Sequence, residues 1–391
     1  MNASIDKAES SHATLFAAQS NGNISTLQLT QSDGSYSLSV VSNTCEAGEN
    51  PSWLNIDSKQ RILYCLDRGH SSSAEGSLNS FCIGERGSLE KIDSVEAPFS
   101  GVAAGYIDFQ DGKRGYVCAS YNKSAIAAFV FASNGTLEPP DQIIHPTSHV
   151  TGPITSRQDD SHAHHVILDP SRRFFLVPDL GADIIRVFQY HPDTFAPLTE
   201  LDPLATEPGA GPRHGVFWRA PGRSNDEGLY LLFNGELSQK VYSYRITYTP
   251  SGLAWEKVFE TYALGRLGET LPPNTAPTSE IAVSPDQRFL LVSSRQHSFE
   301  FSPLLHKEGS DSISTFRIND DASLSLMQVS PSGGYLPRQF SLNRGGDRVA
   351  VGHQGSGTVV VWERNVESGR IEREIAERKL EGPVVFVGWD L

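Results

Sequence analysis

The sequence predicts an all-β protein, a single seven-bladed β-propeller of four-stranded antiparallel blades. Three features lead to this prediction: a composition rich in turn residues, a strand pattern that repeats along the chain, and chain ends that together complete one copy of the pattern. The 391 residues include 34 Gly and 23 Pro, and 38% are hydrophobic. This composition is typical of a globular chain with many tight turns, which favours an all-β fold.

The repeated unit is clearest in the segment HAHHVILDPSRRFFLVPDLGADIIRVFQYH, which begins at His162. Runs of β-branched and aromatic residues alternate there with an Asp-Pro-Ser turn and a Gly-Ala-Asp turn, and this alternation predicts consecutive antiparallel strands. The pattern recurs in segments that begin at Pro51, Ala103, Pro212, Thr278 and Leu336. Repeats spaced by about 40 to 65 residues predict the blades of a propeller.

The two ends of the chain supply the seventh copy. TLFAAQSNGNISTLQL, from Thr14, matches the second and third strands of the unit, and the terminal EGPVVFVGWDL reads as its first strand. Pairing of these segments closes the ring and removes free sheet edges. An open β-sandwich or two smaller β domains is the alternative, but neither explains the split copy. We expect the propeller to span residues 12–391, after a disordered or extended tail of residues 1–11.

Charge and composition exclude several classes of partner. The formal net charge is −14 and the sequence pI about 5.3, which disfavours nonspecific attraction to nucleic acid or to an anionic membrane. The four cysteines show no C-x-x-C spacing, so we expect them to be reduced. Residues 1–12 contain no apolar run, so we expect no signal peptide and no anchor, and hence a cytoplasmic protein.

Polar residues recur at two positions of the repeat. In an up-and-down blade the first strand leaves one face of the ring and the second returns to it, so first-strand starts and second-strand ends meet on that face, near the axial channel. At first-strand starts stand His162, His164, Arg213, His214 and Arg338. At second-strand ends stand Arg68, Tyr121, Asn122, Glu236, Arg295 and Gln354. We therefore expect one polar basin.

Each group has more than one interpretation. His162 and His164 lie on one side of a regular strand and fit zinc ligands, but no third ligand of matching spacing is apparent. We predict no metal and no cofactor, which leaves His164 as a structural histidine or a catalytic base. Arg213 and Arg295 fit structural ion pairs with Glu236. Several arginines around one pocket of an acidic protein instead indicate a bound anion.

Several motifs carry a resemblance to a known family over nearly the whole chain. They are HHVILDP from His164, Gly209-Ala210-Gly211-Pro212-Arg213-His214, Glu236-Leu237 after LLFNG, Ser120-Tyr121-Asn122, Arg295 after LLVSS, Pro337-Arg338, Gln354 and Gly382-Pro383. With them the chain resembles the bacterial-type 6-phosphogluconolactonase family, the seven-bladed lactonases. That family includes a fungal branch similar to the 3-carboxy-cis,cis-muconate lactonising enzyme.

The resemblance implies an active site of His164, Arg213, Glu236 and Arg295, and from their positions in the repeat we expect the other residues of the basin to contact the substrate. It implies hydrolysis of a small anionic sugar lactone, phosphorylated or carboxylated. His164 would activate water, one of the two arginines would stabilise the oxyanion, and the other would hold the anionic group with Arg338. Glu236 would orient these groups or protonate the leaving oxygen.

The chain also departs from the family. Gly235 stands where the family usually has Asn, and the loop after Arg295 is longer than in bacterial members. Three rival functions therefore stay open: lactone formation by a cycloisomerase acting on an unsaturated polycarboxylate, protein binding by a noncatalytic propeller, and metal-dependent gluconolactonase-like chemistry. We expect a monomer or a weak homodimer.

Overall fold

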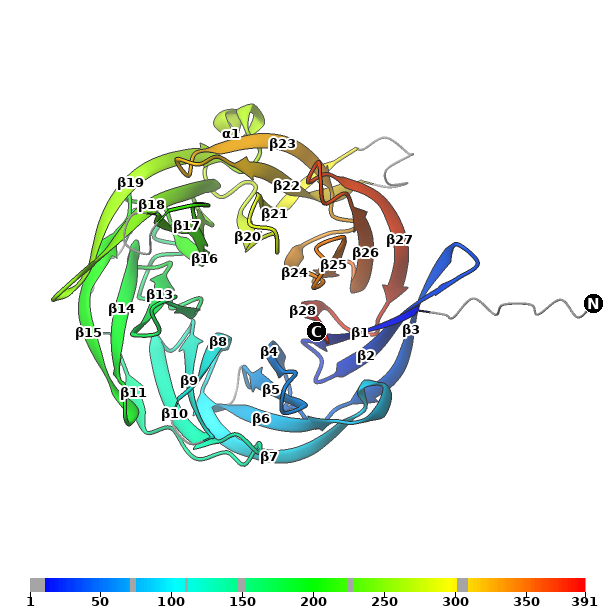
Figure 1. The fold of residues 1–391 in the computed structure, drawn as a ribbon, viewed down its shortest axis with the longest axis horizontal. Coiled ribbons are helices and arrows are strands. Elements are labelled where there is room, and N and C mark those ends of the chain that lie inside the picture. The colour runs from blue at the N-terminus through cyan, green and yellow to red at the C-terminus, as the bar shows by residue number, and fades with distance from the viewer. Residues whose placement is uncertain are drawn as a thin grey trace, which may run out of the picture.

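The computed structural model describes residues 11–70, 75–109, 112–146, 152–223, 228–300 and 309–390. In this part of the chain seven four-stranded antiparallel sheets stand around one axis, as Figure 1 shows. The predicted seven-bladed propeller is confirmed. The expected tail lies outside the described residues except for Ser11, at which the first strand begins. The long segments between repeated units also fall partly outside the described residues, at 147–151, 224–227 and 301–308.

Each of six blades is a consecutive run of strands, with the innermost strand first. The first three blades consist of β4 (Pro51–Asp57), β5 (Ile62–Asp67), β6 (Glu75–Ile83) and β7 (Leu89–Pro98); β8 (Gly101–Asp108), β9 (Lys113–Ser120), β10 (Ala125–Ala132) and β11 (Gln142–Ile144); and β12 (Ile167–Leu168), β13 (Phe174–Asp179), β14 (Ile184–His191) and β15 (Phe195–Ala205).

The next three blades follow the same order. They consist of β16 (Pro212–Arg219), β17 (Leu229–Gly235), β18 (Lys240–Thr249) and β19 (Gly252–Tyr262); β20 (Thr278–Val283), β21 (Phe289–Phe299), β22 (Ser310–Ile318) and β23 (Leu324–Pro331); and β24 (Pro337–Leu342), β25 (Arg348–His353), β26 (Thr358–Arg364) and β27 (Ile371–Lys379).

The seventh blade joins the two ends of the chain. It consists of β28 (Val384–Trp389), β1 (Ser11–Gln19), β2 (Ile24–Ser32) and β3 (Ser35–Thr44). Strand β28 pairs antiparallel with β1 from Leu15 opposite Trp389 to Gln19 opposite Val384, and Figure 1 shows this red strand beside the blue β1. The predicted closure of the ring is thus confirmed. It gives β1 a partner on both sides.

The core lies between neighbouring blades. Alternate side chains of the inner strands point to opposite faces of their sheets and pack against the next blade, because side chains along a strand alternate with period two. Leu232 of one blade and Leu290 of the next share one such cluster, and both are fully buried. The helical segments are short, α1 (Arg266–Thr270) and the 3₁₀ turn η1 (Glu85–Gly87). No helix among the described residues is long and apolar enough to cross a membrane.

Candidate active site

A β-bulge recurs at the start of the innermost strand. We call this end of the strands, on the face of the ring where innermost strands begin and second strands end, the rim. The pairing of first and second strands shifts register after Pro51, Gly101, Pro212, Thr278 and Pro337, the first residue of five innermost strands. A bulge bends the strand and re-aims its side chains. In three of these blades the residue just after the first pair lines a common pocket: Val102, Arg213 and Arg338.

The second strand supplies the opposite part of the rim. The last residues paired with the innermost strand include Asp67, Ser120, Gly235 and Ser294. In each case the next residue lines the same pocket: Arg68, Tyr121, Glu236 and Arg295. In the third blade the first contact is an isolated bridge between Ala163 and Asp179, and His164 follows it into the pocket. The pocket holds about 260 Å³.

Glu236 is the carboxylate around which three guanidinium groups gather. Its Oε2 lies 2.7 Å from Nε of Arg213, and its Oε1 lies 2.6 Å from Nη2 of Arg157 and 3.2 Å from Nη2 of Arg295. Burial raises the pKa of Glu236, but the three positive charges outweigh this effect and lower the pKa to about 2. The carboxyl group is therefore ionised at neutral pH. It orients the arginines and has no proton to give to a leaving oxygen, contrary to one of the expected roles.

The pocket has more positive than negative charge. Five arginines and one glutamate line it. Burial first, and then the charge of Arg295, lowers the pKa of Arg213 to about 10. Burial and the neighbouring charges of Arg213 and Arg68 also lower the pKa of Arg338. The side chain of Arg338 makes no ion pair with the described residues. Repelling cations that share one carboxylate favour an anionic ligand.

The His164 imidazole lies close to the positive charges of Arg213 and Arg338. Its side chain is buried, and its Nδ1 has no hydrogen-bond partner among the described residues. Because Nδ1 is enclosed, Nε2 is the nitrogen that can meet a ligand in the pocket. Burial, followed by the charges of Arg213, His214 and Arg338, lowers the pKa of His164 well below its ordinary value. The ring is therefore neutral at pH 7, the form that accepts a proton.

A layer of buried polar side chains lies next to His164. The His214 ring lies edge-on to His164 at a centroid distance of 5.1 Å and stacks on His165 at 4.3 Å. Nδ1 of His214 lies 3.0 Å from Oε1 of Glu280. Burial raises the pKa of Glu280 to about 7. These three side chains are packed behind the pocket wall and are not among the residues that line it.

Four predicted contacts do not line the pocket: His162, His214, Asn122 and Gln354. His162 stacks flat on Tyr121, with ring centroids 4.2 Å apart, and its Nε2 lies 3.1 Å from Asp159 Oδ1. Asn122 is exposed in the turn after β9. Gln354 is half-buried at the position equivalent to Glu236 in its blade, but does not reach the pocket. A direct role for these four residues stays a prediction.

Sequence reasoning missed two lining residues. Val102 has the same bulge position as Arg213, but an apolar side chain gives no chemical signal. Arg157 comes from the loop that precedes His162, and not from a strand end. The only available signal was the length of the segment between β11 and β12, because long loops often carry binding residues.

The described residues contain no group of three or more His, Cys, Asp or Glu side chains arranged to hold a metal ion. His162 and His164 do not form a pair of ligands. Nδ1 of His162 lies 3.0 Å from the Tyr121 carbonyl oxygen, and its Nε2 contacts Asp159. Both ring nitrogens are thus engaged. The Tyr121 ring contacts both imidazoles.

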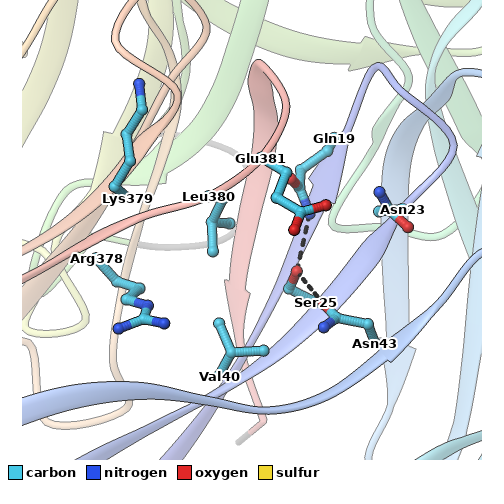
Figure 2. Close-up of a pocket in the computed structure, with 9 residues that line it drawn as sticks. All are labelled: Gln19, Asn23, Ser25, Val40, Asn43, Arg378, Lys379, Leu380 and Glu381. Carbon is cyan, nitrogen blue, oxygen red and sulfur yellow. Dashed lines mark hydrogen bonds between the residues drawn. The ribbon is translucent and has the colours of Figure 1, made fainter.

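A second hollow of about 310 Å³ lies at the seam where the ring closes, and Figure 2 shows its lining. Gln19 donates to Ser25 Oγ at 2.8 Å, and Ser25 donates to Asn43 Oδ1 at 2.6 Å. These polar groups therefore bond to one another. No imidazole lines this hollow. The axial pocket, where a neutral imidazole meets unpaired positive charge, is the better candidate for catalysis.

Relatives of this chain match it over most of its length. It is 26% identical over 374 residues to a protein of Arthroderma benhamiae named "Probable 6-phosphogluconolactonase", covering 95% of this chain and 87% of the relative. It is 22% identical over 326 residues to the 6-phosphogluconolactonase of Bacillus subtilis, covering 82% of each. The periplasmic gluconolactonase of Pseudomonas aeruginosa has the same fold, with a TM-score of 0.76 at 23% identity over 97% of this chain and 99% of that one.

A family model covers almost the whole described chain. The model is that of the lactonases with a seven-bladed β-propeller, and it matches residues 11–388. The match includes all seven blades and every residue that lines the axial pocket. The chain therefore belongs to the family of seven-bladed β-propeller lactonases.

Proposed function

We propose that the protein hydrolyses a small sugar lactone that carries a phosphate or a carboxylate group. One observation supports this proposal above all: a neutral buried imidazole, His164, faces a pocket that five arginines and a single glutamate line. The named activities of the relatives, 6-phosphogluconolactonases and a gluconolactonase, agree with it.

The reaction begins with a water molecule between His164 and the lactone carbonyl. Nε2 of His164 takes a proton from the water as its oxygen bonds to the carbonyl carbon, a contribution worth about 10² to 10⁴ in rate. The carbonyl oxygen becomes an oxyanion, which Arg213 stabilises. Nη1 of Arg213 donates to the Ser279 carbonyl oxygen at 2.6 Å and its Nε pairs with Glu236, so the guanidinium is fixed before charge develops.

The intermediate then collapses. The bond between the carbonyl carbon and the ring oxygen breaks, and the departing alkoxide takes the proton from the His164 imidazolium. The product is the open hydroxy acid, which loses its carboxyl proton to solvent at neutral pH, and His164 is neutral again. Glu236 takes no proton in this sequence, because its three guanidinium partners keep it ionised.

The charge state of the site favours hydrolysis over lactone formation by a cycloisomerase. Such an enzyme must deliver a proton to carbon, and the donors considered for that step are His164 and Glu236. The pKa of each is lowered, so both are deprotonated at neutral pH. A deprotonated imidazole suits a general base that activates water.

Separate assays of the purified protein test the proposal. 6-Phosphogluconolactone, glucono-1,5-lactone and 3-carboxy-cis,cis-muconate are supplied in turn, and acid release or loss of ultraviolet absorbance is followed above the uncatalysed rate. We expect turnover of a lactone, and its loss in His164→Gln. Turnover of the muconate alone would refute hydrolysis.

A cytoplasmic location and a monomeric or weakly dimeric state also stay proposals. Cell fractionation tests the first, and light scattering tests the second.

A further inference from the structure

Arg157 differs from every other arginine that lines the pocket in the element that carries it. The others follow the two rim positions of the blades, whereas Arg157 belongs to the loop before His162. Its side chain is 31% exposed, against 1% for Arg213 and 11% for Arg295. Arg157 is thus the arginine of the Glu236 cluster that solvent, and hence a ligand, reaches most easily.

Several hydrogen-bond donors of the Arg157 guanidinium are unused among the described residues. Both of its contacts use Nη2, which lies 2.6 Å from Glu236 Oε1 and 3.4 Å from the Tyr121 hydroxyl. The donors on Nε and Nη1 make no hydrogen bond with the described residues. A guanidinium has five N–H donors, so Arg157 can hold Glu236 and bind an anion at the same time. Arg213, by contrast, has its Nε enclosed 2.7 Å from Glu236 Oε2 and donates from Nη1 to the Ser279 carbonyl oxygen.

The buried side chain next to Arg157 anchors the loop. The next residue, Gln158, is fully buried. Its Nε2 donates to the Leu180 carbonyl oxygen at 2.9 Å and to Asp183 Oδ1 at 2.7 Å, and its Oε1 accepts from the Ile154 amide at 3.1 Å. A Cβ at Gly152 would lie 2.2 Å from the Gln158 amide carbon, so glycine is needed there. An anchored loop of this kind presents its arginine at small entropic cost on binding.

Tyr121 contacts both Arg157 and His164. The ring of Tyr121 meets the His164 ring edge-on, at a centroid distance of 5.6 Å, while its hydroxyl accepts from Arg157. Arg213 and Arg338 are the arginines whose charges act most strongly on His164. Arg157 is not among them and meets His164 only through the Tyr121 phenol, so we expect a group that it binds to lie farther from His164 than the reacting carbonyl does.

We propose that Arg157 is a specificity-determining residue, which binds the anionic group at the end of the substrate remote from the lactone carbonyl. Gln158 acts through Arg157 as a positioning residue. The inference rests on the proposed lactone hydrolysis and names the residue that selects charged over neutral substrates.

Two lactones with the same ring test this inference, 6-phosphogluconolactone and neutral glucono-1,5-lactone. In Arg157→Ala, KM for the phosphorylated lactone should rise about 10- to 100-fold, the range of one charged hydrogen-bonded contact. Its kcat, and both constants for the neutral lactone, should change much less, because Arg213 and Arg295 still hold Glu236. Arg157→Lys should recover part of the loss. An equal loss for both lactones, or a fall in kcat alone, would overturn the inference.

Matched variants and a binding measurement complete the test. Arg245→Ala removes an exposed arginine with one ion pair, to Glu256 at 3.0 Å, and should change neither substrate's constants. Gln158→Ala should raise the same KM as Arg157→Ala, and the double variant should be no worse than Arg157→Ala alone.

Titration calorimetry measures the binding of 6-phosphogluconate and gluconate and needs no turnover. If the protein hydrolyses neither lactone, the proposed function fails, yet loss of 6-phosphogluconate binding in Arg157→Ala still supports the anion site, and undiminished binding overturns it.

Discussion

The chemistry of single residues here depends on which charges surround them. An isolated histidine titrates near pH 6.5, but burial and the positive charges of Arg213 and Arg338 lower the pKa of His164 well below that value. The charges of Arg295, Arg213 and Arg157 keep Glu236 ionised. The arginines of one pocket, of which Arg213 acts on both residues, therefore favour a neutral histidine and an anionic glutamate, and each residue has the form that its proposed role requires.

The activity of the enzyme should persist at a lower pH than an ordinary histidine base would allow. The base form exists above the pKa, and that of His164 is lowered. We therefore expect the acid limb of kcat/KM to lie below pH 6.5. Glucono-1,5-lactone is the suitable substrate, because it has no phosphate to titrate in this range. His164→Gln should reduce kcat about 10² to 10⁴-fold. A limb at or above pH 6.5 would contradict the assignment.

Replacing Glu236 by Gln should destabilise the protein and make it more responsive to anions. The change leaves three arginines without their carboxylate, and removing one partner of a buried ion pair costs about 3 to 5 kcal/mol. Citrate binds the native state and offsets part of this cost. The increase in thermal midpoint caused by citrate should therefore be larger in Glu236→Gln than in the wild type, as measured by scanning calorimetry.

Glu256→Gln is the matched control, because Glu256 is 63% exposed in its pair with Arg245. Equal citrate responses in all three proteins would show that Glu236 does not compensate the pocket charge.

The pH dependence of the free energy of unfolding has a definite sign at Glu236. The pKa of Glu236 falls from 4.5 to about 2 on folding, so its contribution is present above pH 4.5 and is lost as pH falls toward 2. The wild type should lose more stability than Glu236→Gln in that range.

Residue types at strand ends were enough to find most of the pocket wall, because the blade geometry brings these ends together. They were not enough for His162. The period-two argument needs a regular strand, and around His162 the structure has only the isolated bridge of Ala163 with Asp179. His162 therefore turns onto Tyr121 instead of facing the pocket beside His164. Arg157 lies on a loop, where no periodicity predicts the direction of a side chain.

At the scale of elements, irregular segments do more to place the site than regular strands. The bulges at the rim aim Arg213 and Arg338 toward the axis. A turn at Gly209–Gly211 leads into β16, and both of its glycines have positive φ, 80° and 56°. A Cβ at Gly211 would lie 2.5 Å from Leu237 Cγ. Both the backbone angle and the close approach therefore require glycine just before Arg213.

Asp183 links the two loops that carry arginines. Its Oδ2 accepts from the Gly209 amide at 2.6 Å, and its Oδ1 accepts from the Gly211 amide at 2.8 Å and from Gln158 at 2.7 Å. In Asp183→Asn one oxygen becomes an amide that confronts a backbone donor, which costs about 1 to 3 kcal/mol. Asn also tolerates the positive φ of 53° at this position.

We expect Asp183→Asn to lower the free energy of unfolding by that amount in urea titrations. It should also reduce kcat and raise KM for the phosphorylated lactone together, since the turn before Arg213 and the loop of Arg157 both lose support. Asp321→Asn, at an exposed turn where Asp321 accepts from Ser323, should leave both kinetic constants unchanged. A change in stability without any kinetic effect would contradict the proposed link.

At the scale of the whole molecule, the sequence was most informative about topology. Repeated strands and turns specify the blades, and the split copy at the chain ends specifies closure, because a first strand without its partners must find them elsewhere in the chain. Register shifts at the rim were not predictable from the repeat. They depend on how the first residues of each innermost strand pack around the axis, which local patterns do not encode.

The seam of the ring should be the point at which the fold is most sensitive. Trp389 of β28 is 4% exposed, pairs with Leu15 of β1, and donates from Nε1 to the Ser341 carbonyl oxygen of the neighbouring blade at 3.1 Å. Trp389→Ala should therefore cost about 3 to 5 kcal/mol, measured by urea unfolding. Trp255→Ala, on outer strand β19 and only half-buried, should cost less.

Removal of residues 384–391 is the stronger form of this test. Without β28, the inner edge of β1 exposes unpaired backbone donors and acceptors, the kind of edge that pairs with another chain. Leu15 and Ala17, which are now fully buried against β28, also lose their cover. We expect the truncated chain to aggregate, or to elute as oligomers from a sizing column, and a peptide with the sequence of residues 383–391 to restore part of the monomer. A truncated chain that stays monomeric with unchanged stability would show that closure through β28 does not hold the ring together.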